Sequence, residues 1–199
     1  LLKRDHQVAF IGSIGVGKST AICRMTGLEV PKDDGTQVPV LEVGGGGITV
    51  CEVHLLTGPD YGLLIEPRSD DEIRQDVGDL VDHILKGNSQ QDEDGTAESQ
   101  GISKEVARAL RNMAGLAVQR LKSADGKRVT NDPAKALAEA YPTQREFVVE
   151  VLSRMELHRR DRRDIWYDSA SGKSPKAWLR DTFSAINNGR HPEVTLPRR

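Results

Sequence analysis

A short glycine-rich stretch near the start of the sequence has the residue types and spacing to hold an anion. The eight residues from Gly12 to Ser19 match G-x-x-x-x-G-K-[ST] at every fixed position. Glycines at 12, 15 and 17 let the backbone turn tightly and direct successive N–H groups toward one anion. The helix expected after this stretch adds partial positive charge at its N-terminus. A di- or triphosphate chain fits such a loop.

Two side chains of the stretch supply chemistry for the same ligand. Lys18 can reach the β- and γ-phosphate oxygens as a point charge, and the Ser19 hydroxyl can complete the octahedral shell of a bridging Mg²⁺. The remaining residues expected to bind the phosphates belong to the loop and to the first turn of the helix: Gly12, Ser13, Gly15, Val16, Gly17 and Thr20.

Two elements must position this loop. Residues 7–12 form a short apolar run ending in glycine, which is typical of a buried strand. From Lys18 to Thr26 the pattern predicts a helix of about two to three turns, with Gly27 at its C-cap. The order strand, loop, helix is the context that the pattern requires.

A long connection and two further apolar runs follow. Residues 29–47 contain two prolines and four consecutive glycines and have little periodicity beyond one short extended piece at 38–43. Residues 48–55 are rich in β-branched side chains, and residues 61–66 form a second apolar run after a turn. The two runs predict an antiparallel hairpin.

With these elements around it, the stretch resembles the Walker A motif of the P-loop nucleoside triphosphatases, and the similarity extends over residues 7 to about 66. The resemblance implies an α/β three-layer sandwich, incomplete within this sequence, that binds ATP or GTP with Mg²⁺. The order of strand, loop, helix, long switch and antiparallel second strand is similar to the translation-factor and dynamin-like GTPases. In the branches of the superfamily that bind ATP, the next strand more often pairs parallel to the first after a longer crossover connection.

The resemblance also implies residues that hold the metal and act on water. Thr49 matches the switch threonine that closes over the γ-phosphate and Mg²⁺, and Thr36 is a second candidate. Glu66 matches the acid at the end of the third strand, which holds Mg²⁺ through water. Two alternatives stay open: Glu66 polarises the attacking water itself, or Asp70 and Asp71 take the metal role.

The sequence departs from the GTPase pattern near this acid. The acidic residue is Glu66 instead of aspartate, and Ser69 stands where that pattern has glycine. The Asn-Lys-x-Asp motif that recognises guanine is missing, and the sequence from Lys122 to Asp125 resembles it only distantly. ATP and GTP therefore both remain candidate substrates.

The second half of the chain is predicted to be mainly helical. Apolar residues at helical spacing predict helices over residues 70–85, 103–121, 133–140, 142–165 and 174–187. No convincing strand is expected between Glu66 and Glu193, the only rival to helix being 147–152. We therefore expect a nucleotide-binding core over 1–66, a helical insertion or subdomain over 67–192 with a flexible loop near 86–102, and the start of a further core strand at 193–199.

Composition excludes several classes of protein. The 199 residues carry a formal net charge of −2, and no apolar stretch is long enough to span a membrane. Cys23 and Cys51 lie in apolar patterns typical of buried thiols in a reducing compartment, so we expect a cytoplasmic protein. The near-zero charge gives no support to nucleic-acid binding over the whole surface. The first residue is not methionine, which predicts an excerpt of a longer chain.

Three functional hypotheses follow. In the first, the chain hydrolyses the bound nucleotide to drive a conformational or assembly switch, with a protein partner or a second copy, and Lys18, Thr49 and Glu66 are catalytic. In the second, hydrolysis is negligible and the loops at 29–47 and 86–102 reorder on binding to recruit a partner. The third is a small-molecule kinase whose lid uses the arginines of the basic cluster at 158–163, a cluster that is more often a solvated face.

Overall fold

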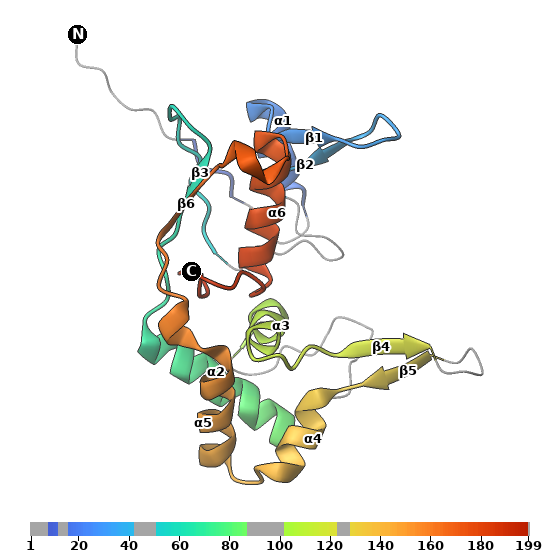
Figure 1. Ribbon diagram of the computed structural model, residues 1–199, viewed down its shortest axis with the longest axis vertical. Helices are drawn as coiled ribbons and strands as arrows, with labels where there is room; N and C mark the ends of the chain where they lie inside the picture. The colour runs from blue at the N-terminus through green and yellow to red at the C-terminus, as the bar shows by residue number, and fades with distance from the viewer. Residues whose placement is uncertain (1–7, 12–15, 42–50, 87–101, 123–127, 199) are drawn as a thin grey trace. The chain divides into compact units, whose positions relative to one another are not determined.

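The computed structural model describes residues 8–11, 16–41, 51–86, 102–122 and 128–198 (Figure 1). They form a mixed α/β structure of helices and two-stranded sheets. Their contacts divide into two compact units, neither of which ends at the boundary expected after Glu66. The first unit consists of the described parts of Leu1–Thr49 with Thr57–Leu63 and Trp166–Ser184, and the second of the described parts of Val50–Leu56, Leu64–Ile165 and Ala185–Arg199.

The first unit packs the helix α1 (Lys18–Thr26) with a short hairpin and most of the helix α6 (Pro175–Asn187), which follows the short η2 (Ser169–Ser171). The hairpin pairs β1 (Glu29–Pro31) antiparallel with β2 (Gln37–Pro39). The ammonium of Lys176 on α6 donates to the carbonyl oxygen of Gly27 at 2.6 Å. The core of this unit is formed by Cys23, Val40, Leu41, Leu179 and Phe183.

The second unit is a helical cluster. It contains α2 (Asp70–Leu85), α3 (Lys104–Met113), α4 (Pro133–Ala140) and α5 (Gln144–Met155), and their apolar faces share one core. Phe147 of α5 is fully buried in it. The ends of these helices follow their caps: Ser69 and Glu72 form a reciprocal capping box at α2, and Ser103 accepts the N–H of Val106 at α3.

Two predicted helices are shorter than expected, and strands follow them. The helix predicted over 103–121 ends at Met113, because Gly115 adopts a left-handed conformation with φ of 69°. The chain then forms β4 (Gln119–Lys122), which pairs antiparallel with β5 (Arg128–Asn131). The helix predicted over 142–165 ends at Met155, where Glu156 turns left-handed before the short η1 (Leu157–Arg159) and β6 (Asp164–Trp166). The expectation of no strand between Glu66 and Glu193 was wrong.

The predicted hairpin of 48–55 with 61–66 was also wrong in its described part. Residues 51–58 form no strand, and β3 (Gly62–Leu64) pairs instead with β6. Backbone hydrogen bonds from Tyr167 to Tyr61 and from Ile65 to Arg163, at 2.8 and 2.7 Å, extend this antiparallel pairing. The partner of β3 is thus about a hundred residues away, which local sequence pattern cannot reveal.

Residues 194–197 are buried within the second unit, between the exposed Glu193 and Arg198. The Leu196 carbonyl accepts the N–H of Arg68 at 3.0 Å, and the N–H of Arg198 donates to the Glu66 carbonyl at 2.7 Å. The N–H of Arg162 donates to the Glu193 carbonyl at 3.1 Å. The segment 193–198 joins its neighbours through isolated bridges and not through a regular strand.

No helix of the described residues is long and apolar enough to cross a membrane. The flexible loop predicted near 86–102 lies, except at its two ends, outside the described residues.

Candidate phosphate-binding site

The helix of the glycine-rich stretch begins where the sequence predicts. Gly17 is its N-cap, with φ of 86° and ψ of 18°, and α1 starts at Lys18. A side chain at position 17 would be strained in this left-handed conformation, so glycine suits the turn into the helix. Gly27 ends α1 with φ of 67°, and the N–H of Leu28 donates to the Cys23 carbonyl at 2.8 Å. The predicted helix of two to three turns with a glycine C-cap is confirmed.

The N-terminus of α1 is suited electrostatically to an anion. No side chain caps it, and its first turn contains no acidic residue. The first backbone N–H groups of a helix have no intrahelical acceptor, and the helix dipole adds positive potential at the same point. Lys18 and Ser19 are half-buried there and Thr20 is exposed. A cationic side chain and a hydroxyl thus lie at the end of the helix that attracts phosphate.

The face of α1 that carries Cys23 packs in the core of the first unit. Cys23 is fully buried, and its sulfur accepts the N–H of Leu41 at 3.4 Å. Burial raises the pKa of the Cys23 thiol, which keeps it neutral. The prediction of a buried thiol is confirmed at this position, whereas Cys51 is only half-buried. This packing fixes one face of the helix and leaves its N-terminus at the surface.

The structure describes only part of the motif before Gly17. Gly12, Ser13 and Gly15 lie outside the described residues, and Val16 is 60% exposed. The strand predicted over 7–12 was wrong in its described part, because residues 8–11 form no strand and Ile11 is 93% exposed. An apolar run becomes a buried strand only when neighbouring strands satisfy its backbone, and no described strand pairs with it.

Four other residues expected to hold metal or water lie outside the described residues or in the second unit. Thr49 lies outside the described residues. Glu66 is exposed two residues after β3 and belongs to the second unit, as do Asp70 and Asp71 in the first turn of α2. No group of three or more His, Cys, Asp or Glu residues that could hold a metal is found within the described ranges.

Thr36, the second switch candidate, has a local role in the turn between β1 and β2. Its backbone N–H and its hydroxyl both donate to Oδ1 of Asp34, at 2.9 and 2.6 Å. The hydroxyl of Thr36 lowers the pKa of Asp34, with a further contribution from the Thr36 backbone N–H. Side-chain bonds of this kind stabilise a tight turn. The hydroxyl is therefore already engaged in the hairpin.

Three arginines of the basic cluster at 158–163 have structural partners. The guanidinium of Arg160 donates to the carbonyl oxygen of Met155 at 2.8 Å, and burial lowers its pKa. Arg162 forms an ion pair with Glu193 at 2.6 Å, and Arg159 pairs with Glu156 at 3.2 Å. These contacts join the end of α5 to the segment around Glu193, a role that the charge pattern alone did not indicate.

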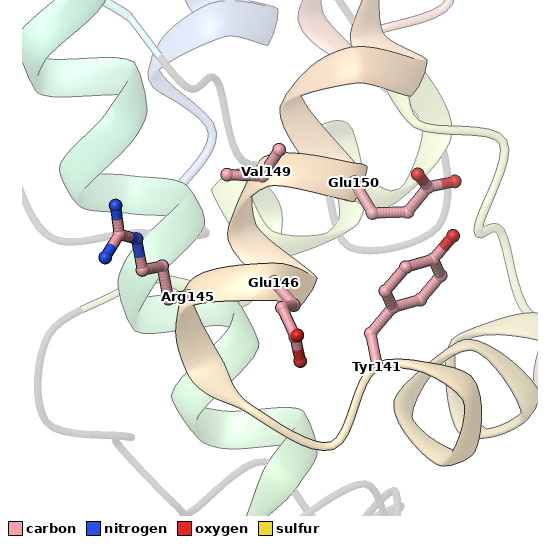
Figure 2. Close-up of a pocket in the computed structure, with 5 residues that line it drawn as sticks. All are labelled: Tyr141, Arg145, Glu146, Val149 and Glu150. Atoms are coloured by element: carbon pink, nitrogen blue, oxygen red, sulfur yellow. The ribbon is translucent and has the colours of Figure 1, made fainter.

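A shallow hollow of about 440 Å³ lies beside α5 in the second unit (Figure 2). The ring of Tyr141 and the carboxylate of Glu150 lie on the same side of the helix, and Arg145 extends from the other side. Both carboxylates of the hollow are engaged: Glu150 pairs with Arg154 at 2.6 Å, and Glu146 accepts the hydroxyl of Thr143 at 2.6 Å. No sequence motif indicates this hollow, and both of its carboxylates have partners within or beside α5.

Comparison with protein-family models, with curated protein sequences and with solved structures found no match to this chain.

Proposed function

We propose that this chain binds a Mg²⁺-nucleoside triphosphate, ATP or GTP, through residues 12–19 and hydrolyses it, as a P-loop nucleoside triphosphatase does. One observation carries the proposal: α1 begins at Lys18, directly after a left-handed glycine, within a complete G-x-x-x-x-G-K-S sequence. Sequence and local geometry thus agree at the point where a phosphate would bind.

Each residue of the helix start has a distinct role in this proposal. The ammonium of Lys18 stabilises negative charge on the β- and γ-phosphates, and the backbone N–H groups of the first turn bind the same oxygens. The Ser19 hydroxyl is one oxygen ligand of Mg²⁺, and its half-buried position in the first turn suits that role. Bound Mg²⁺ would neutralise charge that develops on the transferred phosphoryl group.

Thr49 and Glu66 complete the catalytic proposal. Thr49 contributes a second oxygen ligand to the metal, and Glu66 holds the metal-bound water or orients the attacking one. These two roles are supported by the sequence resemblance alone. The three-layer sandwich that would bring the two residues to α1 likewise stays a prediction.

The test is calorimetric titration of the full chain with ATP and with GTP, each with Mg²⁺, followed by phosphate release from whichever nucleotide binds. Lys18→Ala should abolish binding, because it removes the cation that faces the phosphates. Lys32→Ala, at an exposed lysine of the same unit, is the matched control and should bind like the wild type. Far-UV circular dichroism checks that both variants fold.

Each outcome decides between hypotheses. Binding that Lys18→Ala removes, with phosphate release, supports the nucleoside triphosphatase and identifies the base. Binding without phosphate release refutes hydrolysis and leaves a nucleotide-gated interaction module. If neither nucleotide binds, or if Lys32→Ala weakens binding as much as Lys18→Ala does, the proposed site is wrong.

A further inference from the structure

The turn over residues 190–193 is held in the second unit by two arginines from the stretch between η1 and β6. The guanidinium of Arg160 donates to the carbonyl oxygens of His191 and Val194, to the latter at 3.5 Å. The backbone N–H of Arg162 donates to the carbonyl oxygen of Glu193 at 3.1 Å, and its guanidinium pairs with the Glu193 carboxylate at 2.6 Å. We call Arg160, Arg162, His191 and Glu193 the clasp.

The imidazole of His191 closes the turn from within. Its Nδ1 accepts the backbone N–H of Glu193 at 3.2 Å, across the intervening Pro192. A ring nitrogen accepts a hydrogen bond only when it carries no proton, and both ring nitrogens of a charged imidazole are donors. The closed clasp therefore requires a neutral His191.

On balance, the surroundings of His191 favour the neutral ring. Within the described residues, the charged groups that act on it are Glu193 in the turn and Arg162 and Arg160 across from it. Burial lowers the pKa of His191; the Glu193 carboxylate opposes this change, and the two guanidiniums add to it. A proton on the ring would thus cost hydration, meet two positive charges and remove the hydrogen bond from Glu193.

We propose that the clasp is a pH-sensitive switch, in which protonation of His191 opens the turn over residues 190–193 while the helical core of the second unit stays folded. The other residues of the turn are already exposed, so it can open without uncovering the buried residues 194–197. Opening gives the charged imidazole the water and the distance from the arginines that it lacks in the closed turn. It also frees Arg162 from Glu193, which makes the surface beyond α5 more basic in acid.

The sign of the pH dependence follows from the two states of the turn. In the open turn His191 is in water and titrates near its ordinary pKa of 6.5, whereas in the closed turn its pKa is lower. The closed turn is therefore fully stable above pH 6.5. Below that value, the ratio of open to closed turns should rise by up to about tenfold for each pH unit, until the pH passes the lowered pKa.

The experiment is hydrogen exchange of the full chain, followed by mass spectrometry between about pH 5 and pH 8. Exchange of the unfolded chain at each pH corrects for the intrinsic rate. Peptides over 158–165 and 188–195 report on the clasp, and a peptide over 104–113 reports on the buried core at α3. No nucleotide is present, so the result does not depend on the function proposed for α1.

Two histidine variants separate the switch from other effects of pH. In His191→Asn the amide oxygen can still accept the N–H two residues ahead, as asparagine does in many turns, but the side chain does not titrate. His158→Asn is the matched control, because His158 is an exposed histidine of η1 in the same unit. Circular dichroism checks that both variants fold.

A further measurement needs no variant. In NMR spectra of the wild-type chain, the imidazole signals of His191 and the amide signal of Glu193 should titrate with one midpoint below pH 6.5, because the ring and the amide share a hydrogen bond.

In the wild-type chain, exchange of the clasp peptides should accelerate by up to about tenfold per pH unit below the ordinary histidine pKa. His191→Asn should abolish this acceleration, and His158→Asn should retain it. The proposal is overturned if the corrected exchange of the clasp does not depend on pH, if His191→Asn keeps the dependence or His158→Asn loses it, or if the Glu193 amide does not follow the imidazole. It is overturned equally if the clasp is as well protected as α3, because the turn would then open only when the whole unit unfolds.

Discussion

Replacing Gly17 by alanine tests whether the left-handed turn before α1 is part of the phosphate site. Gly17 has φ of +86°, and a Cβ built there meets no atom within 4 Å. The substitution therefore causes no clash. It reduces the folding stability only because a residue with a Cβ disfavours the left-handed backbone, by about 1–2 kcal/mol. Gly35, in the turn between β1 and β2, has φ of +80° and equally open surroundings. Gly35→Ala should cost the same stability.

The two variants should differ in nucleotide binding. At Gly17 the penalty acts on the conformation that leads the backbone into the first turn of α1. A penalty of about 1–2 kcal/mol lowers the population of that conformation about 5- to 30-fold, and the apparent Kd for the nucleotide rises by the same factor. At Gly35 the penalty acts on a turn to which no phosphate contact is assigned, so the Kd should not change.

Urea unfolding measures the stability of both variants, and calorimetric titration with Mg²⁺ and the nucleotide that binds the wild type measures their affinity. Equal stability losses with a weakened Kd only for Gly17→Ala support the site. The reasoning is refuted if Gly17→Ala binds as tightly as the wild type. It is refuted equally if Gly35→Ala loses as much affinity, because binding would then follow stability alone.

Two further predictions concern the second unit. Asp132→Ala should reduce the free energy of unfolding in urea by about 3–5 kcal/mol, because it leaves the nearly buried guanidinium of Arg111 unpaired; Asp132→Asn, which can still cap α4, should cost about 1 kcal/mol less. The exposed Glu139→Ala is the control, and a loss below about 1 kcal/mol for Asp132→Ala would contradict the reasoning. Burial lowers the pKa of His191, and its Nδ1 accepts the N–H of Glu193 at 3.2 Å, so stability should fall as pH drops below 6.5 and through the lowered folded value. His191→Asn should flatten this dependence in urea titrations at several pH values, and an unchanged profile would show that other groups cause it.

Helices with strong local caps could be predicted from the sequence almost to the residue. The bounds of α2 and α4 agree with the predicted ranges, since Ser69 and Asp132 cap them and Pro133 starts the second. The end of α1 follows from Gly27 in the same way. These capping residues lie within a few residues of the helix ends that they determine, so a single sequence is enough to predict those ends.

Strands were predicted poorly for two reasons. The strands of the local hairpins β1–β2 and β4–β5 have three or four residues and too few apolar side chains to show a strand pattern, whereas β3 pairs with β6, about a hundred residues away. The run at 48–55 has the pattern of a strand, but its described part, 51–55, pairs with nothing in the described structure, whereas β6, which has no strong pattern, pairs with β3. The same limit applies to the candidate site. Gly17, Lys18 and Ser19 are neighbours in sequence and could be identified together, but the place of Glu66 depends on how distant segments pack.

The burial of residues 194–197 has a consequence for folding during synthesis. Leu196 is fully buried in the core that the helices of the second unit share, and the segment pairs with residues near Pro67. Contacts between positions so far apart raise the contact order of the unit and slow its folding. When only α2 to α5 have left the ribosome, the core of the second unit still lacks the segment that contains Leu196. The second unit should therefore acquire its full resistance to proteolysis only after residue 198 has left the exit tunnel.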